Sequence, residues 1–208
     1  PTLALLPTVA WDTGLRAEWE IGETAAHRRL AAFCDSSLSA DPTQRDMPGE
    51  AGTSRLSPHL HFGEISPGRI LYALHQYDSK SLKGREAFTR ELGWREFAYH
   101  VLYHFPGSTR QPLDPRYKGF PWHRGGRRLL QAWQRGQTGI PLVDAGMRQL
   151  WHMGWMHNRA RMVSASFLVK NGLVSWTRGA RWFWDTLVDA DLASNNLNWQ
   201  WVAGCGAD

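Results

Sequence analysis

Several residue patterns that define common protein classes are absent from this chain of 208 residues. Its two cysteines, Cys34 and Cys205, have no Cys-x-x-Cys spacing and are too few for a framework of several disulfides, so we expect a reduced, cytoplasmic setting. No apolar run reaches the roughly 18 residues that a membrane span needs. The apolar first residues, 1–10, lack the basic region of a secretion signal. The sequence therefore predicts no membrane partner.

Alternating runs of β-branched residues and internal repeats are also absent, and apolar residues recur instead at helical spacing. With 42% hydrophobic and 21% charged residues, the chain has enough apolar side chains for one core and does not have the composition of a disordered segment. We predict an all-α fold, with a linker remnant over 1–12 and one helical domain over 13–208. The expected helices cover 18–33, 66–74, 86–105, 129–136, 141–153, 156–171 and 177–188, with loops over 34–58 and after residue 188.

What the chain has in excess is tryptophan, with 12 residues, most of them after residue 120 and interleaved with arginine, histidine and asparagine. A buried indole needs a partner for its N–H, so tryptophan is a poor general filler of a core. Indoles stack on bases and flavins, attract cations and give up an electron readily. The net charge of +5 and the pI near 9.6 favour an anionic partner. Cations mix with aromatic residues over 122–128 and 157–162, which favours nucleic acid as that partner.

The segment 52–57, Gly-Thr-Ser-Arg-Leu-Ser, has residue types suited to binding an anion. Its small residues let backbone amides approach a phosphate, its hydroxyls donate, and Arg55 supplies charge. The same pattern is typical of an ordinary helix cap, and both interpretations stay open. The segment is not a P-loop, because no Gly-Lys-Ser/Thr follows.

A carboxylate, an indole and a guanidinium are predicted on one helix face by the i, i+3, i+4 spacing of Glu91, Trp94 and Arg95. The alternative is a solvated Glu–Arg pair beside a packed tryptophan. His100 and His104 have a metal-compatible spacing, but no third ligand is visible, so we expect no metal site.

Two later segments carry the remaining polar clusters. In 154–162, Asn158, Arg161 and Met162 share a helix face with Arg159 at its flank, and the two arginines lie at a helix start, where external anions or carboxylates must compensate them. In 189–195, two carboxylates and a carboxamide follow an apolar helix: Asp189, Asp191 and Asn195. This cluster can pair with the arginines, hydrogen-bond a heterocycle or bind a metal, and the metal is the weakest option because no histidine accompanies it.

In this order, these segments resemble the FAD-binding domain of the photolyase/cryptochrome family. The resemblance runs from about residue 41 to 208 and is carried by GTSRLSPHLHFGEISP (52–67), ELGWREF (91–97), GIPLVDAGMRQL (139–150), GWMHNRARM (154–162), FWDTLVDAD (183–191) and NNLNWQW (195–201). It implies an all-helical domain that binds FAD and works as a monomer on DNA in the bacterial cytoplasm, associated with the nucleoid.

The resemblance also implies a role for individual residues. The FAD contacts would be Thr53, Ser54, Arg55, Leu56, Ser57, Phe88, Arg95, Asn158, Arg161, Asp189, Asp191 and Asn195. Among them, Arg161 and Asp189 match a salt bridge beside the flavin ring, Asp191 matches a partner of the ring edge, and Asn195 matches the residue that faces the flavin N5. Trp199, Trp176 and Trp122 match a chain of three indoles that passes an electron inward.

The implied activity is a carbon–carbon lyase reaction, in which light-driven electron transfer from reduced FAD splits a cyclobutane pyrimidine dimer flipped out of single- or double-stranded DNA. The catalytic positions are matched by Glu91, Asn158 and Met162, and the lesion would lie between Trp94 and Trp201, with Arg159 on the DNA phosphate. Relatives of the (6-4) photoproduct type carry histidines at positions 158 and 162, so this chain resembles the cyclobutane class. The two fused pyrimidines stack poorly, which lowers the cost of extruding them.

Two positions depart from the family pattern, and both ends differ from it. Asp41 stands where a tyrosine is usual, and a carboxylate near a diphosphate would reduce FAD affinity; Phe88 replaces a usual tryptophan. The family normally has an N-terminal α/β domain, which would hold an antenna chromophore of unknown identity, and further C-terminal helices. The resemblance thus implies a domain truncated at both ends.

Two rival functions remain. A cryptochrome-like blue-light photoreceptor would bind the same flavin, although Glu91, Asn158, Met162 and Asn195 favour repair. A plain DNA-binding module would have lost its cofactor, and the flavin absorption of the purified chain distinguishes it.

Overall fold

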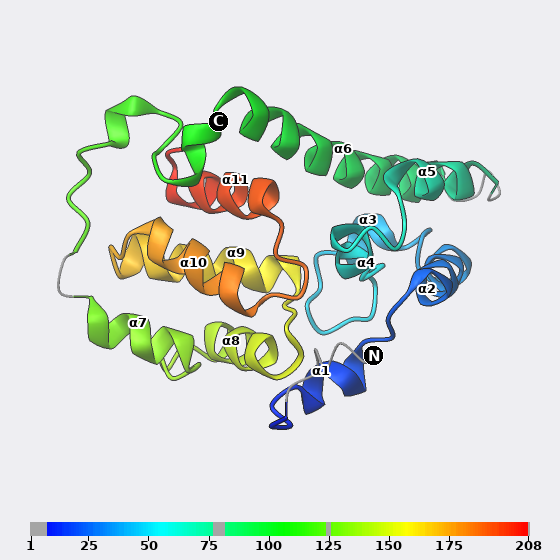
Figure 1. The fold of residues 1–208 in the computed structure, drawn as a ribbon, viewed down its shortest axis with the longest axis horizontal. Helices are drawn as coiled ribbons and strands as arrows, with labels where there is room; N and C mark the ends of the chain where they lie inside the picture. The colour runs from blue at the N-terminus through cyan, green and yellow to red at the C-terminus, as the bar shows by residue number, and fades with distance from the viewer. Residues whose placement is uncertain (1–7, 77–81, 124–125, 208) are drawn as a thin grey trace.

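The chain forms helices and loops without a strand in the part that the computed structural model describes, residues 8–76, 82–123 and 126–207 (Figure 1). The predicted all-α class is therefore confirmed. None of the helices in these ranges combines the length and the apolar composition needed to span a membrane. The elements are α1 (Thr13–Glu18), α2 (Glu23–Ser36), α3 (Asp41–Gln44), α4 (Ser57–His61), α5 (Pro67–Gln76), α6 (Leu82–His104), two 3-10 turns (Pro106–Thr109 and Pro115–Tyr117), α7 (Arg127–Gln134), α8 (Pro141–Met153), α9 (Asn158–Ser166), a π-helical turn (Phe167–Asn171), α10 (Trp176–Thr186) and α11 (Leu192–Ala203).

Within the described ranges, the buried apolar side chains form two clusters rather than one. The larger cluster belongs to α7–α11 and is centred on residues such as Trp133, Met147 and Leu168, which are almost fully buried. The smaller cluster belongs to α2, α4, α5 and the first half of α6 and includes Phe33 and Ile70. The long helix α6 passes from the smaller cluster to α11, against which its second half packs (Figure 1).

Turn residues explain the helices that the sequence predicts well. Helix α8 has the predicted bounds because Pro141 fits the first turn, where no backbone N–H is needed, and Gly154 ends the helix in the left-handed region with φ 66°. Helix α5 likewise begins with Pro67, as expected.

The predicted helix over 18–33 is wrong at its start. Gly22 has φ 105°, a conformation that breaks a helix, so α1 ends at Glu18 and α2 begins at Glu23. Ile21, which the spacing predicts on the apolar face, lies in this break and is 88% exposed. The predicted loop 34–58 is also interrupted, since α2 continues to Ser36 and α3 forms a short turn.

The predicted C-terminal loop is wrong, because residues 192–203 form α11. The Asp191 carboxylate accepts a hydrogen bond from the Ser194 N–H at 2.7 Å and caps the helix. Helix α11 is buried on more than one side, by Ala193, Asn196, Trp199, Gln200 and Val202, so its apolar residues show no single stripe. The predicted helix 156–171 begins two residues later, at Asn158, and continues as the π-helical turn.

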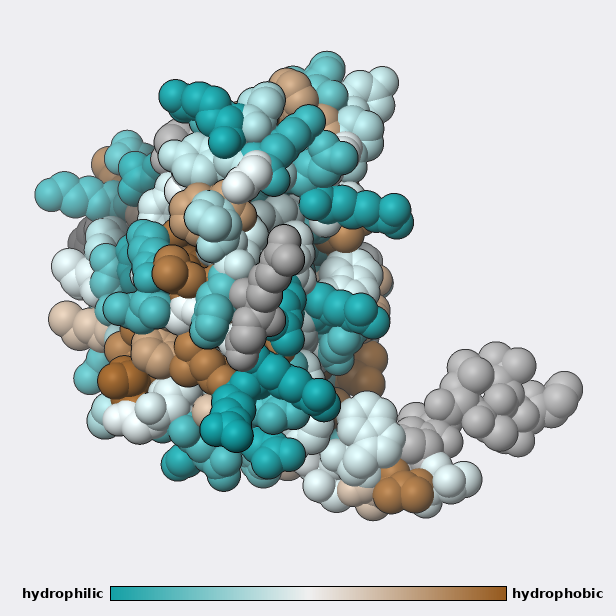
Figure 2. All heavy atoms as spheres, turned by 90° about the vertical axis from the view of Figure 1, so that its left-hand side faces the viewer, coloured by the Kyte–Doolittle hydropathy of each residue, from teal (hydrophilic) through white to brown (hydrophobic). Residues whose placement is uncertain are grey.

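Hydrophilic residues predominate at the end of the molecule that faces the viewer in Figure 2, and the hydrophobic residues there form small, separated groups. The predicted boundary at residue 12 stays a prediction, because residues 1–7 lie outside the described ranges.

Candidate functional site: two cavities beside helix α9

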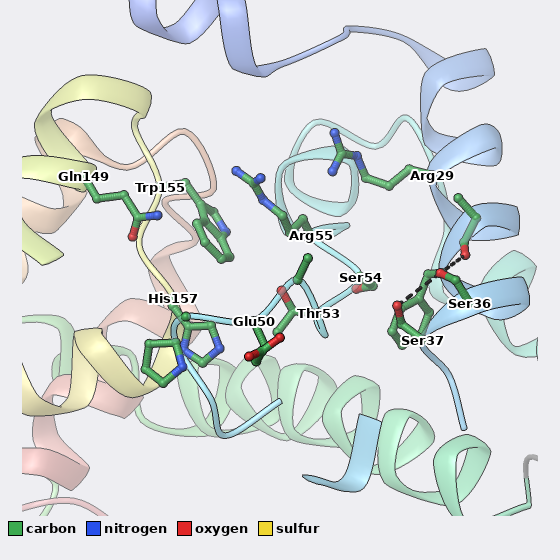
Figure 3. Close-up of a pocket in the computed structure, with 15 residues that line it drawn as sticks. Arg29, Ser36, Ser37, Glu50, Thr53, Ser54, Arg55, Gln149, Trp155 and His157 are labelled. Carbon is green, nitrogen blue, oxygen red and sulfur yellow. Dashed lines mark hydrogen bonds between the residues drawn. The ribbon is translucent and has the colours of Figure 1, made fainter. Parts of the chain in front are cut away.

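A cavity of about 670 Å³ lies where α6, α9 and α11 meet. It gathers predicted site residues that are distant in the sequence: Glu91, Trp94, Arg95, Asn158, Arg159, Arg161, Met162, Asp189, Asp191, Asn195, Trp199 and Trp201. A second cavity, of about 450 Å³, is lined by Thr53, Ser54 and Arg55 (Figure 3). The start of α9 separates the two, since His157 lines the smaller cavity and Asn158 the larger.

The Glu91 carboxylate in the larger cavity is held by an arginine that sequence reasoning missed. Arg45 Nη1 donates to Glu91 Oε1 at 2.6 Å, whereas Arg95 pairs with Glu96 at 2.5 Å. The Glu91–Arg95 pair that the helix spacing permits is therefore not formed. Trp94, one turn from Glu91, is 59% exposed and presents its ring at the cavity rim. Nothing in the sequence marks Arg45, because it lies in a polar segment far from α6.

Carboxylates compensate both arginines at the start of α9, as one of the predicted alternatives requires. Arg159 Nη2 lies 2.6 Å from Asp46 Oδ1, and its Nη1 contacts the Met162 sulfur at 3.1 Å. Asn158 Nδ2 lies 3.9 Å from the same sulfur, so the three residues form one wall of the larger cavity.

The predicted Arg161–Asp189 salt bridge is confirmed. Arg161 Nη2 donates to Asp189 Oδ2 at 2.8 Å, and Arg161 Nε donates to the Met156 carbonyl oxygen at 2.7 Å. The Asp189 side chain is 2% exposed, and its Oδ1 is a buried acceptor without a hydrogen-bond partner among the described residues. Because an unpaired buried acceptor is costly, this oxygen is available to a donor on a ligand.

Asp191 and Asn195 lie at the start of α11, on the same side of the larger cavity. Asp191 uses one carboxylate oxygen to cap the helix and accepts a hydrogen bond from the Tyr99 hydroxyl with the other. Burial and this hydrogen bond raise the pKa of Tyr99, so its hydroxyl stays a donor at neutral pH. Asn195 donates from Nδ2 to the Ala180 carbonyl oxygen at 2.9 Å, which fixes its amide plane. No feature of the sequence marks Tyr99 as a site residue.

Hydroxyl and guanidinium groups line the smaller cavity (Figure 3). Arg55 adopts φ 52°, a conformation rare for residues other than glycine, in the turn that carries Thr53 and Ser54. Gly52 is buried there, and a Cβ at this position would collide with Gln44. Arg29 of α2 also lines the cavity and was not predicted.

His157, which sequence reasoning also missed as a site residue, caps α9 beside the smaller cavity. Its Nδ1 accepts a hydrogen bond from the Arg159 N–H at 3.2 Å. Burial, followed by the charges of Arg159 and Arg161, lowers the pKa of His157, so the ring is neutral at neutral pH.

Three predicted cofactor contacts do not line either cavity: Leu56, Ser57 and Phe88. Leu56 is 1% exposed, and the Phe88 ring packs on Phe33 with their centroids 4.8 Å apart in the smaller core cluster. Their roles toward a cofactor stay predictions. The prediction for Asp41 concerns a side chain that lies outside the described part of the structure.

The three tryptophans of the predicted electron chain differ in burial. Trp199 and Trp176 are 2% and 3% exposed, and Trp122 is half-buried against the same core cluster. The Trp199 ring contacts Phe183 and Trp133, with centroids 5.0 and 6.1 Å away. Gly179 permits this position, since a Cβ there would overlap the Trp199 ring.

Comparisons with known proteins define the class to which this chain belongs. The family model of the FAD-binding domain of DNA photolyase matches residues 88–208. The deoxyribodipyrimidine photo-lyase of Agrobacterium fabrum is 48% identical over 207 residues, which are 98% of this chain and 43% of that protein. The chain therefore belongs to the photolyase FAD-binding domain family, and it spans less than half the length of the curated relatives it matches.

Solved structures agree with this membership. A bacterial class III photolyase from Agrobacterium tumefaciens superposes with a TM-score of 0.92 at 47% identity, over 99% of this chain and 43% of that one. A cryptochrome from Synechocystis superposes with a TM-score of 0.88 at 34% identity, over 100% of this chain and 44% of that one. The fold is thus shared by a photolyase and by a cryptochrome.

Proposed function

We propose that this chain is the cofactor- and lesion-binding domain of a light-driven enzyme that repairs cyclobutane pyrimidine dimers in DNA. The observation that carries the proposal is the composition of the larger cavity, in which Glu91, Asn158 and Met162 lie together with the Arg161–Asp189 pair. The similarity to photolyases along nearly the whole chain supports the same conclusion.

The donors and acceptors of the two cavities fit the parts of FAD. The smaller cavity offers the hydroxyls of Thr53 and Ser54 and positive charge, which suit a diphosphate. The larger cavity offers the free Asp189 Oδ1, the Asp191 carboxylate and the Asn195 amide, which suit the polar edge of a flavin ring. Reduced FAD, when bound, supplies the light-excited electron for splitting the dimer.

The position of Glu91 supports a role in binding the lesion. Its carboxylate is half-exposed in the cavity and fixed by Arg45, so one oxygen remains for an N–H of a pyrimidine. Because Arg45 compensates the Glu91 charge, the pair can hold the lesion without repelling the negative charge that the lesion gains, and Glu91 would keep the reduced lesion in the geometry for splitting.

The remaining contacts to DNA would come from the cavity rim. Trp94 and Trp201 are 59% and 46% exposed, and the extruded pyrimidines would stack on the exposed parts of their rings. Arg159 is partly exposed and paired with Asp46, which a DNA phosphate would replace as its anion. We propose that the domain acts as a monomer on single- or double-stranded DNA.

The proposed function is tested with the purified chain, FAD and an oligonucleotide that contains one thymine dimer. We expect the chain to acquire flavin absorption and, after chemical reduction of the flavin, to restore the dimer to thymines under blue light and not in the dark. Flavin binding without repair would refute the enzyme and leave the photoreceptor. Absence of flavin absorption would refute both and support a plain DNA-binding module.

A cryptochrome-like photoreceptor is the second candidate because the Synechocystis cryptochrome shares the fold over the whole chain. Such a protein would bind flavin and change its absorption under blue light. It would give equal affinities for damaged and undamaged DNA, whereas the repair function predicts a preference for the dimer.

A further inference from the structure

Two arginines line the smaller cavity, and one of them is already paired with a carboxylate of the chain. Arg55 Nη1 lies 2.5 Å from Glu18 Oε1, and its guanidinium lies over the rings of Trp19 and Trp155, at 4.9 and 4.5 Å from their centroids. Its Nη2 contacts the Met153 sulfur at 3.7 Å. The guanidinium of Arg55 is thus bound by α1, α8 and the segments that follow them. Its charge is neutralised by Glu18.

Arg29 is in the opposite situation. It lies on α2, lines the same cavity, and in the described part of the chain makes no ion pair; its guanidinium lies 5.4 Å from the centroid of the Trp19 ring, which it shares with Arg55. Burial, followed by the neighbouring Arg55 charge, lowers the pKa of Arg29, and Glu18 opposes this effect only in part. A partly buried cation without an anion is unfavourable, so the cavity holds positive charge that an anionic ligand would compensate.

The groups around Arg29 are those of an anion site. The hydroxyls of Ser36 and Ser37, at the end of α2, lie on the same side of the cavity as Arg29, and Thr53 and Ser54 face them from the turn (Figure 3). Glu50 is the one carboxylate among the lining residues, and it lies across the cavity from both guanidinium groups.

We propose that Arg29 supplies the positive charge that binds the diphosphate of the cofactor, while Arg55 holds the turn in place for its backbone and for the Thr53 and Ser54 hydroxyls. This inference rests on the proposed function, because it assigns a residue to FAD binding. It also changes the role that the residue types of segment 52–57 predict for Arg55, from the source of charge to a positioning residue. The ligand chemistry that Arg29 recognises is a phosphate ester of a flavin, as opposed to the flavin ring itself.

The test compares FAD with riboflavin, which has the ring and no phosphate, on the full chain. We expect Arg29→Gln to weaken FAD binding roughly 10- to 100-fold, the loss of one charge-assisted contact, and to leave riboflavin binding within about twofold. Arg29→Lys should restore most of the FAD affinity. The matched control is Arg28→Gln, at the next position of α2, where the exposed arginine pairs with Glu20 and does not line the cavity. Binding is measured by the quenching of flavin fluorescence, and helix content by circular dichroism.

The outcomes separate this inference from the proposed function. If the wild-type chain binds FAD and Arg29→Gln binds it as tightly, the role of Arg29 is refuted and the FAD domain stands. If Arg29→Gln weakens FAD and riboflavin equally, Arg29 acts on the shape of the site rather than on phosphate, which also refutes the inference. If the wild-type chain binds neither ligand, the proposed function fails first and the inference falls with it.

Discussion

The Arg161–Asp189 pair makes a quantitative prediction, because it connects α9 to the segment before α11 inside the larger cavity. In Asp189→Asn the shape is kept and the charge is lost, which leaves the Arg161 guanidinium without its anionic partner. Breaking a fully buried pair costs about 3–5 kcal/mol. Arg161 is 23% exposed and an asparagine can still accept a hydrogen bond, so we expect a loss of about 1.5–3 kcal/mol in the free energy of unfolding.

The assay is denaturation in urea at neutral pH, followed by circular dichroism, with the slope of the transition unchanged between variants. Asp185→Asn is the matched control, because it is the same substitution at an exposed position of α10. Arg161→Gln together with Asp189→Asn should destabilise less than the sum of the single variants by about 1 kcal/mol or more. The reasoning is refuted if Asp189→Asn is as stable as Asp185→Asn, or if the two single effects simply add.

Three further predictions concern function and pH. Glu91→Ala should lower the repair yield more than the affinity for the dimer, because the proposed contribution of Glu91 comes after electron transfer. Glu86→Ala, on the exposed side of α6, should change neither quantity. Equal losses in yield and affinity would overturn this role of Glu91. Arg159→Gln should weaken DNA binding and reduce the slope of log affinity against log salt by about 1. Arg181→Gln removes the same charge elsewhere and is the control for this slope. An unchanged slope in Arg159→Gln would exclude a phosphate contact by Arg159. The pKa of His157 is lowered in the folded chain, so as the pH falls the unfolded chain binds a proton at this ring before the folded chain does. The stability that the neutral ring contributes is therefore present above the ordinary pKa of 6.5 and is lost as the pH falls below 6.5. His157→Gln should therefore flatten the acid side of a stability-against-pH curve, His75→Gln should not, and identical curves would contradict the buried neutral ring.

Local signals in the sequence were enough for part of the fold. Proline at a first helical turn and glycine at a helix end determine backbone geometry by themselves, which is why α8 was predicted with its full bounds. Helix α11 was missed because its stability comes from packing on several sides and from the Asp191 cap, and neither leaves an apolar stripe in the sequence.

In the candidate site too, local motifs could be predicted from the sequence and long-range partners could not. The motif residues of α6, α9 and α11 do gather in one cavity, as the resemblance implies. Their partners Arg45 and Tyr99 could not be predicted, because each lies on a different element from the group that it contacts. Arg29 of the smaller cavity was missed for the same reason, since only the tertiary fold brings α2 to the turn that carries Thr53 and Ser54. Helix spacing permits a Glu91–Arg95 pair, but Glu91 pairs with the distant Arg45, and Arg95 pairs with Glu96.

The two core clusters have a consequence for how the chain unfolds. The smaller cavity is lined by Phe33 of one cluster and by Trp155 and His157 beside the other, so a ligand there touches both. Without it, the helices of each cluster can open with separate free energies, since α6 is the main helix of the described residues that packs on elements of both clusters. A ligand that binds only when both clusters are closed adds its binding free energy to a single opening event. The cofactor would then determine whether this chain unfolds as two cooperative units or as one.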